Sequence, residues 1–260
     1  MITLLLVDVQ KDFHPGGSLA IPTASDDAAR IASFITKHAK SIHRIVVTLD
    51  THPKWHIAHP TFWTRTPAAA AAATESTDDA HGIEEEEEDF IGQHPAPFTV
   101  ISSEDIRLKK WIPTSIPNNS TTTSTSAAAG DFVDKAIFAK GGTIPENLFS
   151  SSTSSSSSSM DLTEYCAEYA HRLESSSNRK FSLTIWPEHC ILGSPGHDIV
   201  DDVALAISAW KEEEVGTSRT VEYIQKGMNP YTEMYSAICA EVPVDASTSF
   251  NYELVDSVSR

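Results

Sequence analysis

The chain has 260 residues and a formal net charge of −17. That length can bury a full hydrophobic core, so one domain over 1–260 that carries insertions is expected. The negative charge argues against binding the phosphate backbone of nucleic acids, and no apolar run approaches the roughly 20 residues of a membrane-spanning helix. The three scattered cysteines do not form a disulfide framework, and no secretory signal is visible, so a cytoplasmic location is expected.

Four short apolar segments predict the strands of a mainly parallel sheet. They are ITLLLV (2–7), RIVVTL (44–49), FSLTIW (181–186) and TVEYIQ (220–225). The first two are nearly continuous aliphatic runs, which is typical of parallel strands covered on both faces.

Helical patterns lie between these strands. Residues 25–40 begin with a Ser/Asp capping signal, and residues 198–212 repeat apolar positions at helical spacing. The apolar residues that share one face of the first pattern are Ala29, Ile31, Phe34 and Ile35. Alternation of strands and helices predicts a doubly wound α/β sheet.

Residues 64–180 interrupt this alternation as an insertion. Their Ala-, Glu- and Thr/Ser-rich tracts cannot bury enough apolar surface to become ordered; the tracts are 68–73, 84–89, 118–126 and 150–159. The acidic tract is expected to be a solvated loop rather than a calcium site, because calcium requires spaced oxygen ligands and a turn glycine.

Two segments of this insertion are expected to be ordered. Residues 95–113 carry aromatic and aliphatic anchors, and residues 161–174 predict a helix with one apolar stripe. The stripe consists of Leu162, Tyr165, Cys166, Tyr169 and Leu173. Such a stripe indicates core packing, including the Cys166 thiol.

Polar residues follow each predicted strand. Asp8 ends the first strand, Asp50 the second and Lys226 the fourth, while the third runs into WPEHC with His189. The carboxyl ends of parallel strands meet at one edge of a sheet, where ligands bind in open α/β folds. These side chains are therefore expected to share one crevice.

Asp50 and His52 could direct their side chains toward one ion from an extended segment, and His189 could complete a set of two histidines and a carboxylate. Three protein ligands with open positions are typical of a reactive metal site. Two alternatives stay open. The imidazoles of His52 and His189 could bond backbone groups without binding a metal ion. His56 and His59 could be further ligands or surface residues.

Asp8 and Lys226 suit acid–base chemistry. A carboxylate beside an ammonium group in a partly dry crevice keeps both groups charged and can activate a nucleophile. The alternative is a purely structural ion pair.

The strand-end motifs resemble those of the nicotinamidase/isochorismatase-like cysteine hydrolases, in a longer-looped amidase-like branch. The motifs are DVQKDF, DTHPKWH, WPEHCILGSPG and KG, in the order of that family. The resemblance covers about 1–62 and 181–250, and more weakly 95–113. It implies an isochorismatase-like hydrolase fold and hydrolysis of a small amide such as nicotinamide through a cysteine thioester, with release of ammonia.

The resemblance also implies a role for each matched residue. Asp8 would be the general base, and Lys226 would stabilise the thiolate and the developing negative charge. The implied ligands of a divalent metal ion, with zinc expected, are Asp50, His52 and His189. The implied walls of the pocket for the substrate ring are Phe13 and Trp186. A homo-oligomer is compatible with these features.

The resemblance assigns the nucleophile to none of the three cysteines. Cys190 is the small buried neighbour in the WPEHC turn, with Gly193 and Gly196 as turn residues. Cys239 falls before the strand–helix junction that carries the nucleophile in the family, and the sequence ends at Arg260, where the next strand is expected. The domain is therefore predicted to be incomplete at its C-terminal end.

Three functions stay open on this basis. The first is a nicotinamidase-like hydrolase, and the second is a catalytically inactive relative that binds a metal ion or small ligand. The third is an interaction protein whose acidic and Ser-rich insertions matter more than its crevice.

Overall fold

The computed structural model describes residues 2–66, 93–114, 161–175, 181–212 and 219–259. The four low-complexity tracts predicted within the insertion lie outside these described residues. The chain divides into two compact units, one of Met1–Lys54 with Trp186–Arg260 and one of Trp55–Ile185. The first unit contains every residue predicted for the strand-end site, and the single-domain organisation stays a prediction. None of the helices in the described ranges has the length and apolar character that a membrane crossing requires.

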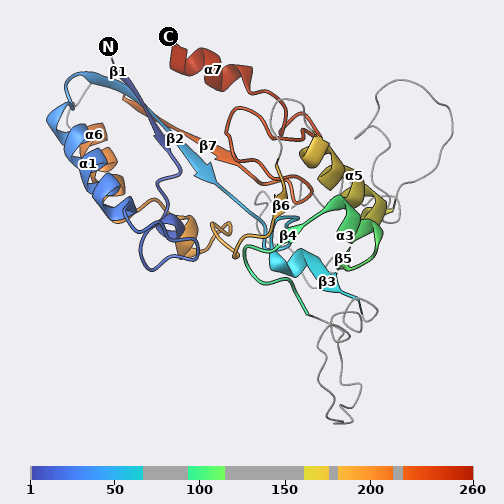
Figure 1. The fold of residues 1–260 in the computed structure, drawn as a ribbon. Helices are drawn as coiled ribbons and strands as arrows, with labels where there is room; N and C mark the ends of the chain where they lie inside the picture. Colours follow the sequence, from blue (N-terminus) through green and yellow to red (C-terminus); the bar gives the residue numbers. More distant parts are fainter. Residues whose placement is uncertain (1, 67–92, 115–160, 176–180, 213–218, 260) are drawn as a thin grey trace, which may run out of the picture. The chain divides into compact units, whose positions relative to one another are not determined.

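A three-stranded parallel sheet of order β1-β2-β7 forms the centre of the first unit (Figure 1). Strands β1 (Ile2–Val7) and β7 (Thr220–Lys226) both pair with β2 (Ile42–Asp50). The register places Val7 opposite Thr48 and Asp50 opposite Lys226. The predicted mainly parallel α/β sheet is confirmed, and all three strands end at the same edge.

Helices α1 (Ala24–Lys37) and α6 (Asp201–Glu212) pack on each other and cover one face of this sheet (Figure 1). Ile45 and Val47 of β2 are fully buried in the core under these helices. On the other face, Val46 packs in a second cluster with Leu254 of α7 (Tyr252–Ser259). Helices therefore lie on both faces, which explains the continuous apolar run of β2.

Helix α1 corrects part of the predicted pattern. It begins at Ala24, one residue before the Ser/Asp signal, and no side chain caps its first turn. The residues that face the core are Ala24, Ala28, Ile31 and Ile35, whereas Ala29 and Phe34 are exposed. The core residues follow the 4-3-4 spacing of a narrow helical stripe, and Ala29 and Phe34 lie beside it.

Two strand predictions are also corrected. The third predicted strand forms only β6 (Leu183–Thr184), which pairs antiparallel with β4 (Val100–Ile101) in the second unit. Its alternation of buried and half-buried residues is typical of a strand with one covered face. The first strand is not covered on both faces either, because Leu5 and Val7 of β1 are 42% and 61% exposed.

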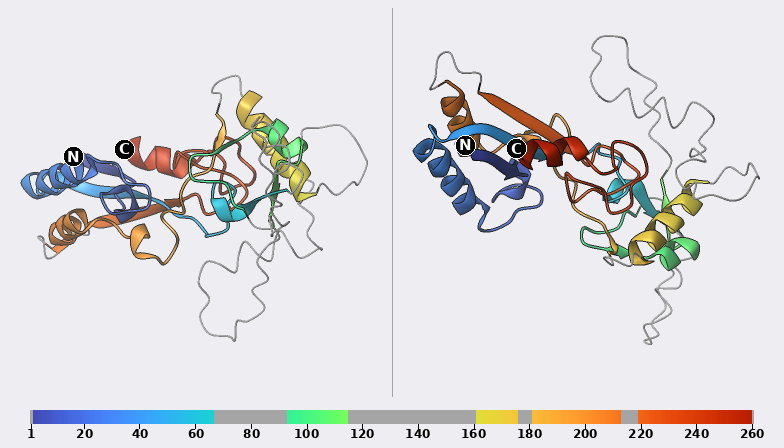
Figure 2. Two further views of the ribbon diagram at one scale, coloured as in Figure 1. Left: turned by 60° about the horizontal axis from the view of Figure 1, so that its bottom comes forward. Right: turned by 90° about the horizontal axis from the view of Figure 1, so that it is seen from above.

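The second unit combines a small antiparallel pair with two packed helices. Strand β3 (Trp63–Arg65) follows the short helix η2 (Pro60–Phe62) and pairs with β5 (Trp111–Pro113). Helix α3 (Ser103–Arg107) packs on α5 (Leu162–Ser175), as Figure 2 shows from two directions. The predicted stripe of α5 is confirmed for its buried residues, which are Tyr165, Cys166, Tyr169 and Leu173; Leu162 is half-buried.

Candidate active site at the strand ends

The ammonium group of Lys226 lies between two carboxylates at the shared edge of the sheet. Its Nζ is 3.0 Å from Asp50 Oδ1 and 3.2 Å from Asp8 Oδ2, and it also donates to the carbonyl of Met234 at 3.4 Å. The hydroxyl of Thr48 donates to Asp8 Oδ1 at 2.7 Å. The structure thus brings together the side chains of three predicted site residues that are up to 218 positions apart in the sequence.

Charge pairing outweighs burial in this group. Burial opposes ionisation of Asp50, but His52, His189 and Lys226 hold the pKa of Asp50 well below its ordinary value. Burial likewise opposes the charge on Lys226, yet Asp50 and Asp8 raise the pKa of that ammonium group. Both groups are therefore charged at neutral pH, as expected for opposite charges at hydrogen-bond distance.

The carboxylate of Asp50 also faces two imidazoles. Its Oδ1 is 3.1 Å from His52 Nε2, and its Oδ2 is 3.2 Å from His189 Nε2. One donor atom from each of these three buried residues lies within 4.8 Å of the others, so together they could hold a metal ion. These are the three residues that the sequence suggests as metal ligands, and their role as ligands stays a prediction.

Hydrogen bonds to the backbone orient both imidazoles. His52 Nδ1 lies 3.0 Å from the carbonyl of Gly227, and His189 Nδ1 lies 2.8 Å from the carbonyl of Pro187. A carbonyl can only accept, so each Nδ1 carries the hydrogen. In the neutral ring each Nε2 then presents a lone pair to the Asp50 carboxylate, which is the orientation that backbone partners give to metal-binding histidines.

Gly227 allows this placement of His52. The residue follows β7 with a φ of +79°, a conformation that L side chains rarely adopt. A Cβ at this position would lie 2.6 Å from His52 Cε1. The glycine of the KG motif is therefore needed for both the backbone turn and the space that His52 occupies.

The two predicted aromatic residues lie in the same unit. The ring of Phe13 meets that of His189 edge-on, with centroids 5.7 Å apart. Trp186 Nε1 donates to the hydroxyl of Tyr235 at 3.3 Å, and the two rings are perpendicular. Burial and nearby Glu233 raise the pKa of Tyr235, so its hydroxyl keeps its proton. Tyr235 is not among the residues predicted for the site, although it lies only nine positions after Lys226 in the sequence.

None of the three cysteines has the properties of an activated nucleophile. Burial raises the pKa of the thiols of Cys166, Cys190 and Cys239, and nearby acidic groups raise each further. Reactive cysteines instead have lowered pKa values and an electropositive environment. Cys190 is fully buried, which confirms its predicted place in the WPEHC turn.

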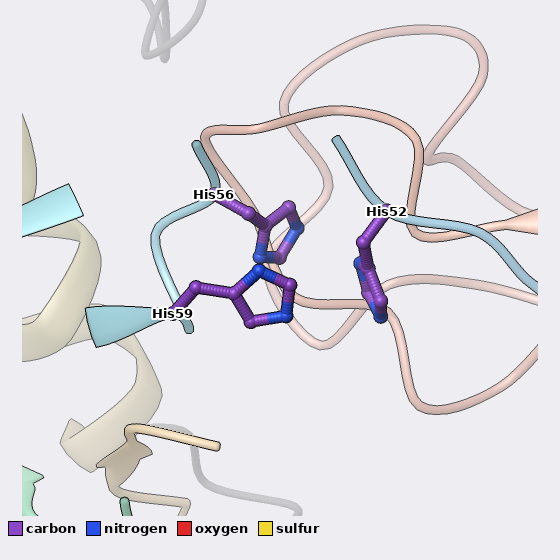
Figure 3. A group of neighbouring side chains, drawn as sticks. All are labelled: His52, His56 and His59. Atoms are coloured by element: carbon purple, nitrogen blue, oxygen red, sulfur yellow. The ribbon is translucent and has the colours of Figure 1, made fainter. Parts of the chain in front are cut away.

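His56 and His59 are buried side by side in the second unit, with ring centroids 5.2 Å apart (Figure 3, which also draws His52 of the first unit). His56 Nδ1 accepts a hydrogen bond from the backbone N–H of Ala58 at 3.2 Å. In the neutral ring Nε2 then carries the hydrogen, which is the opposite tautomer to that of His52. Their role as further metal ligands stays a prediction.

Two residues that bond the backbone of the site segments are not evident from the sequence. Gln10 is fully buried and bonds the backbone of Asp50, and Asp12 accepts a hydrogen bond from the backbone N–H of Cys190. Both belong to the DVQKDF motif, in which only Asp8 and Phe13 received roles. Their positions two and four residues after Asp8 are the one signal that the sequence offers.

No family model matches the chain. A yeast (Saccharomyces cerevisiae) nicotinamidase is 42% identical over 59 residues, which cover 22% of this chain and 27% of that enzyme, so the match spans about a quarter of the relative's length. A structure of the yeast nicotinamidase Pnc1p aligns over 99% of this chain and 69% of its own, at 16% identity and a TM-score of 0.44. An Acinetobacter baumanii nicotinamidase structure aligns over 99% and 64%, at 16% identity and a TM-score of 0.41. In sequence the chain resembles the nicotinamidases, as its strand-end motifs predict.

Proposed function

We propose that the chain acts as a nicotinamidase-like hydrolase, which cleaves the C–N bond of a small amide such as nicotinamide and releases ammonia. One observation carries this proposal: Asp8, Lys226 and the Asp50 ligand group lie together at one edge of the sheet. The local identity to a nicotinamidase supports the choice of substrate class.

The residues at Asp50 fit a divalent metal ion. The Nε2 lone pairs of His52 and His189 face carboxylate oxygens at 3.1 and 3.2 Å. Two acceptors at this distance repel each other unless a cation, either a proton or a metal ion, lies between them. Two imidazoles and one carboxylate are a donor set that zinc favours, and they leave coordination positions open. When bound, zinc would supply Lewis-acid binding of a substrate ring nitrogen.

The remaining residues have distinct tasks in this proposal. Asp8 takes up the proton of the attacking nucleophile, and the ammonium group of Lys226 lies 3.2 Å from its carboxylate. Lys226 stabilises the negative charge that develops during the attack on the amide carbon. Phe13 and Trp186 are the proposed walls of the pocket for the substrate ring.

A second candidate is a relative that binds a metal ion or small ligand without turnover. The raised pKa of all three thiols favours it, since a thiol that keeps its proton is a poor nucleophile. The two candidates share the metal site and differ only in catalysis.

Ammonia release from nicotinamide by the purified, zinc-loaded protein distinguishes them. Hydrolysis is expected to raise ammonia in a glutamate dehydrogenase-coupled assay, and the Asp8→Asn variant is expected to lose this signal while keeping bound zinc. Equal ammonia release by Asp8→Asn would contradict the assigned base and indicate a contaminating amidase. Zinc binding with no ammonia release by the unsubstituted protein would refute the hydrolase and favour the second candidate.

A further inference from the structure

The side chain of Gln10 continues the hydrogen-bond ladder of the sheet where β1 ends. The chain leaves β1 at Asp8, whose φ is +52°, so among the described residues no strand lies opposite the last residue of β2 on that side. The amide of Gln10 takes this place: Oε1 accepts from the N–H of Asp50, and Nε2 donates to its carbonyl, both at 2.7 Å. Nε2 also donates to the carbonyl of His197 at 3.0 Å.

Only a primary amide satisfies all three of these contacts. The amide oxygen of Gln10 accepts from one N–H, and the two hydrogens on its Nε2 are donated to two carbonyls. Gln10 is fully buried, so water cannot replace a missing partner. On its other side the backbone of Asp50 is fixed by its pairing with Lys226 of β7. The peptide that carries the central carboxylate is therefore held from both sides.

Asp12 does the same for the segment that carries His189. Its Oδ2 accepts from the N–H of Cys190 at 2.6 Å, and its Oδ1 accepts from the N–H of Ser18 at 3.1 Å. Cys190 directly follows His189 and has a φ of +47°, a conformation that needs support in a residue other than glycine. A Cβ on Gly196 would lie 2.1 Å from Asp12 Oδ2, so the neighbouring turn is shaped around this carboxylate.

We infer that Gln10 and Asp12 are positioning residues that preorganise the proposed metal site, although neither is one of its proposed ligands. Together we call them the bracket. Gln10 fixes the peptide of Asp50, and Asp12 fixes the bend after His189, so two of the three donor groups are set in place before an ion binds. The inference rests on the proposed metal site, and it adds the reason why that site keeps its geometry.

The test uses substitutions that keep size and reverse one hydrogen bond. Gln10→Glu places a carboxylate oxygen against two carbonyls, and Asp12→Asn places an NH₂ group against a backbone N–H. Gln225→Glu and Asp26→Asn are matched controls, because the same chemical changes then occur on exposed side chains of β7 and α1. Zinc affinity is measured by chelator competition, and Co²⁺ absorption spectra report the coordination geometry in the folded protein.

Each bracket variant is expected to bind zinc about 10–100-fold more weakly, the usual effect of changing a partner of a metal ligand. Its Co²⁺ spectrum is expected to shift, while both controls stay within about twofold of the unsubstituted protein. A residue that served only the fold would lower stability and leave the spectrum of the folded protein unchanged. If one bracket variant does not fold, the zinc affinity and Co²⁺ spectrum of the other variant test the inference.

Three results would overturn the inference. Unchanged zinc affinity and an unchanged Co²⁺ spectrum in the bracket variants would refute the bracket while leaving the metal site intact. Loss of the fold in both variants would assign Gln10 and Asp12 to the fold instead. Failure of the unsubstituted protein to bind either ion would refute the proposed metal site itself, and the bracket with it.

Discussion

Replacing Gly227 by alanine tests whether His52 must keep its present place for a metal ion to bind. The added Cβ would lie 2.6 Å from Cε1 and 3.0 Å from Nδ1 of His52, so the imidazole has to move. The backbone also has to keep a φ of +79° with a side chain attached, which costs about 1–2 kcal/mol of folding free energy. Gly227→Ala is therefore expected to lower both stability and metal affinity.

The effect on metal binding can be sized from the same contact. The carbonyl of Gly227 is the hydrogen-bond partner of His52 Nδ1, and loss of such a partner weakens metal binding about 10–100-fold. At a free zinc concentration about 100 times the dissociation constant, binding stabilises the unsubstituted protein by about 2.7 kcal/mol. A 100-fold weaker site would gain only about 0.4 kcal/mol under the same conditions.

Urea unfolding with and without zinc separates the two effects. Gly16→Ala is the matched control, because Gly16 has a φ of +98° but no heavy atom of the described residues within 4 Å of the added Cβ. Both variants are expected to lose about 1–2 kcal/mol without zinc, and only Gly227→Ala is expected to lose the stabilisation by zinc. Full zinc stabilisation of Gly227→Ala would refute the role of His52 as a ligand in this position.

Three further predictions concern the lysine, the core and the second unit. Lys226→Met leaves the buried carboxylate of Asp50 and the half-buried carboxylate of Asp8 without their cation. Urea unfolding of the zinc-free protein should therefore show a loss of about 3–5 kcal/mol; a loss below about 1 kcal/mol would contradict the buried pairing of Lys226 with Asp50. Ile45→Ala should cost about 2–5 kcal/mol because the residue is fully buried, whereas Leu5→Ala on the exposed side of β1 should cost clearly less in the same assay, and equal losses would be inconsistent with this core. Burial raises the pKa of Asp105, but hydrogen bonds such as that from Lys110 give a net decrease below its ordinary value of 3.8. Above pH 3.8 the ionised carboxylate therefore stabilises the fold, and this stabilisation is lost as the pH falls through the lower pKa of the folded state. The loss of unfolding free energy caused by Asp105→Asn should therefore shrink on acidification. A loss that does not depend on pH would refute the lowered pKa of Asp105.

The sequence predicts the central sheet well because its signal is local. Ile45, Val46 and Val47 are all buried, and a strand buried on both faces has to be continuously apolar. The segment 181–186 is predicted as a strand for the same local reason, but its partner is not encoded locally. Pairing of Leu183 with Ile101 depends on a segment about 80 residues away, so composition alone places β6 in the wrong sheet.

The candidate site divides in the same way. Asp8, Asp50 and Lys226 are predictable because each stands at the end of a strand, where the topology brings them together. Gly227 shows only that a turn is near, and its contact with His52 becomes visible once β2 and β7 are adjacent. Tyr235 belongs to a segment without regular periodicity, and its partner Trp186 lies 49 residues away.

The motif DVQKDF shows why a reactive residue is easier to predict from sequence than a residue that positions the backbone of the site. Asp8 is recognisable because a carboxylate at a strand end can move a proton, whereas Gln10 has no reactive group and is an ordinary polar residue in the sequence. The role of Gln10 depends on the end of β1. Because the chain turns away at Asp8, β1 offers no backbone partner to the N–H and carbonyl of Asp50, and the Gln10 side chain bonds both groups instead. A primary amide supplies both hydrogen bonds in one planar group, and a carboxylate or hydroxyl of similar reach cannot. The need for a glutamine thus arises where β1 ends beside Asp50, which belongs to the candidate ligand group on β2. This relation exists only in the folded chain.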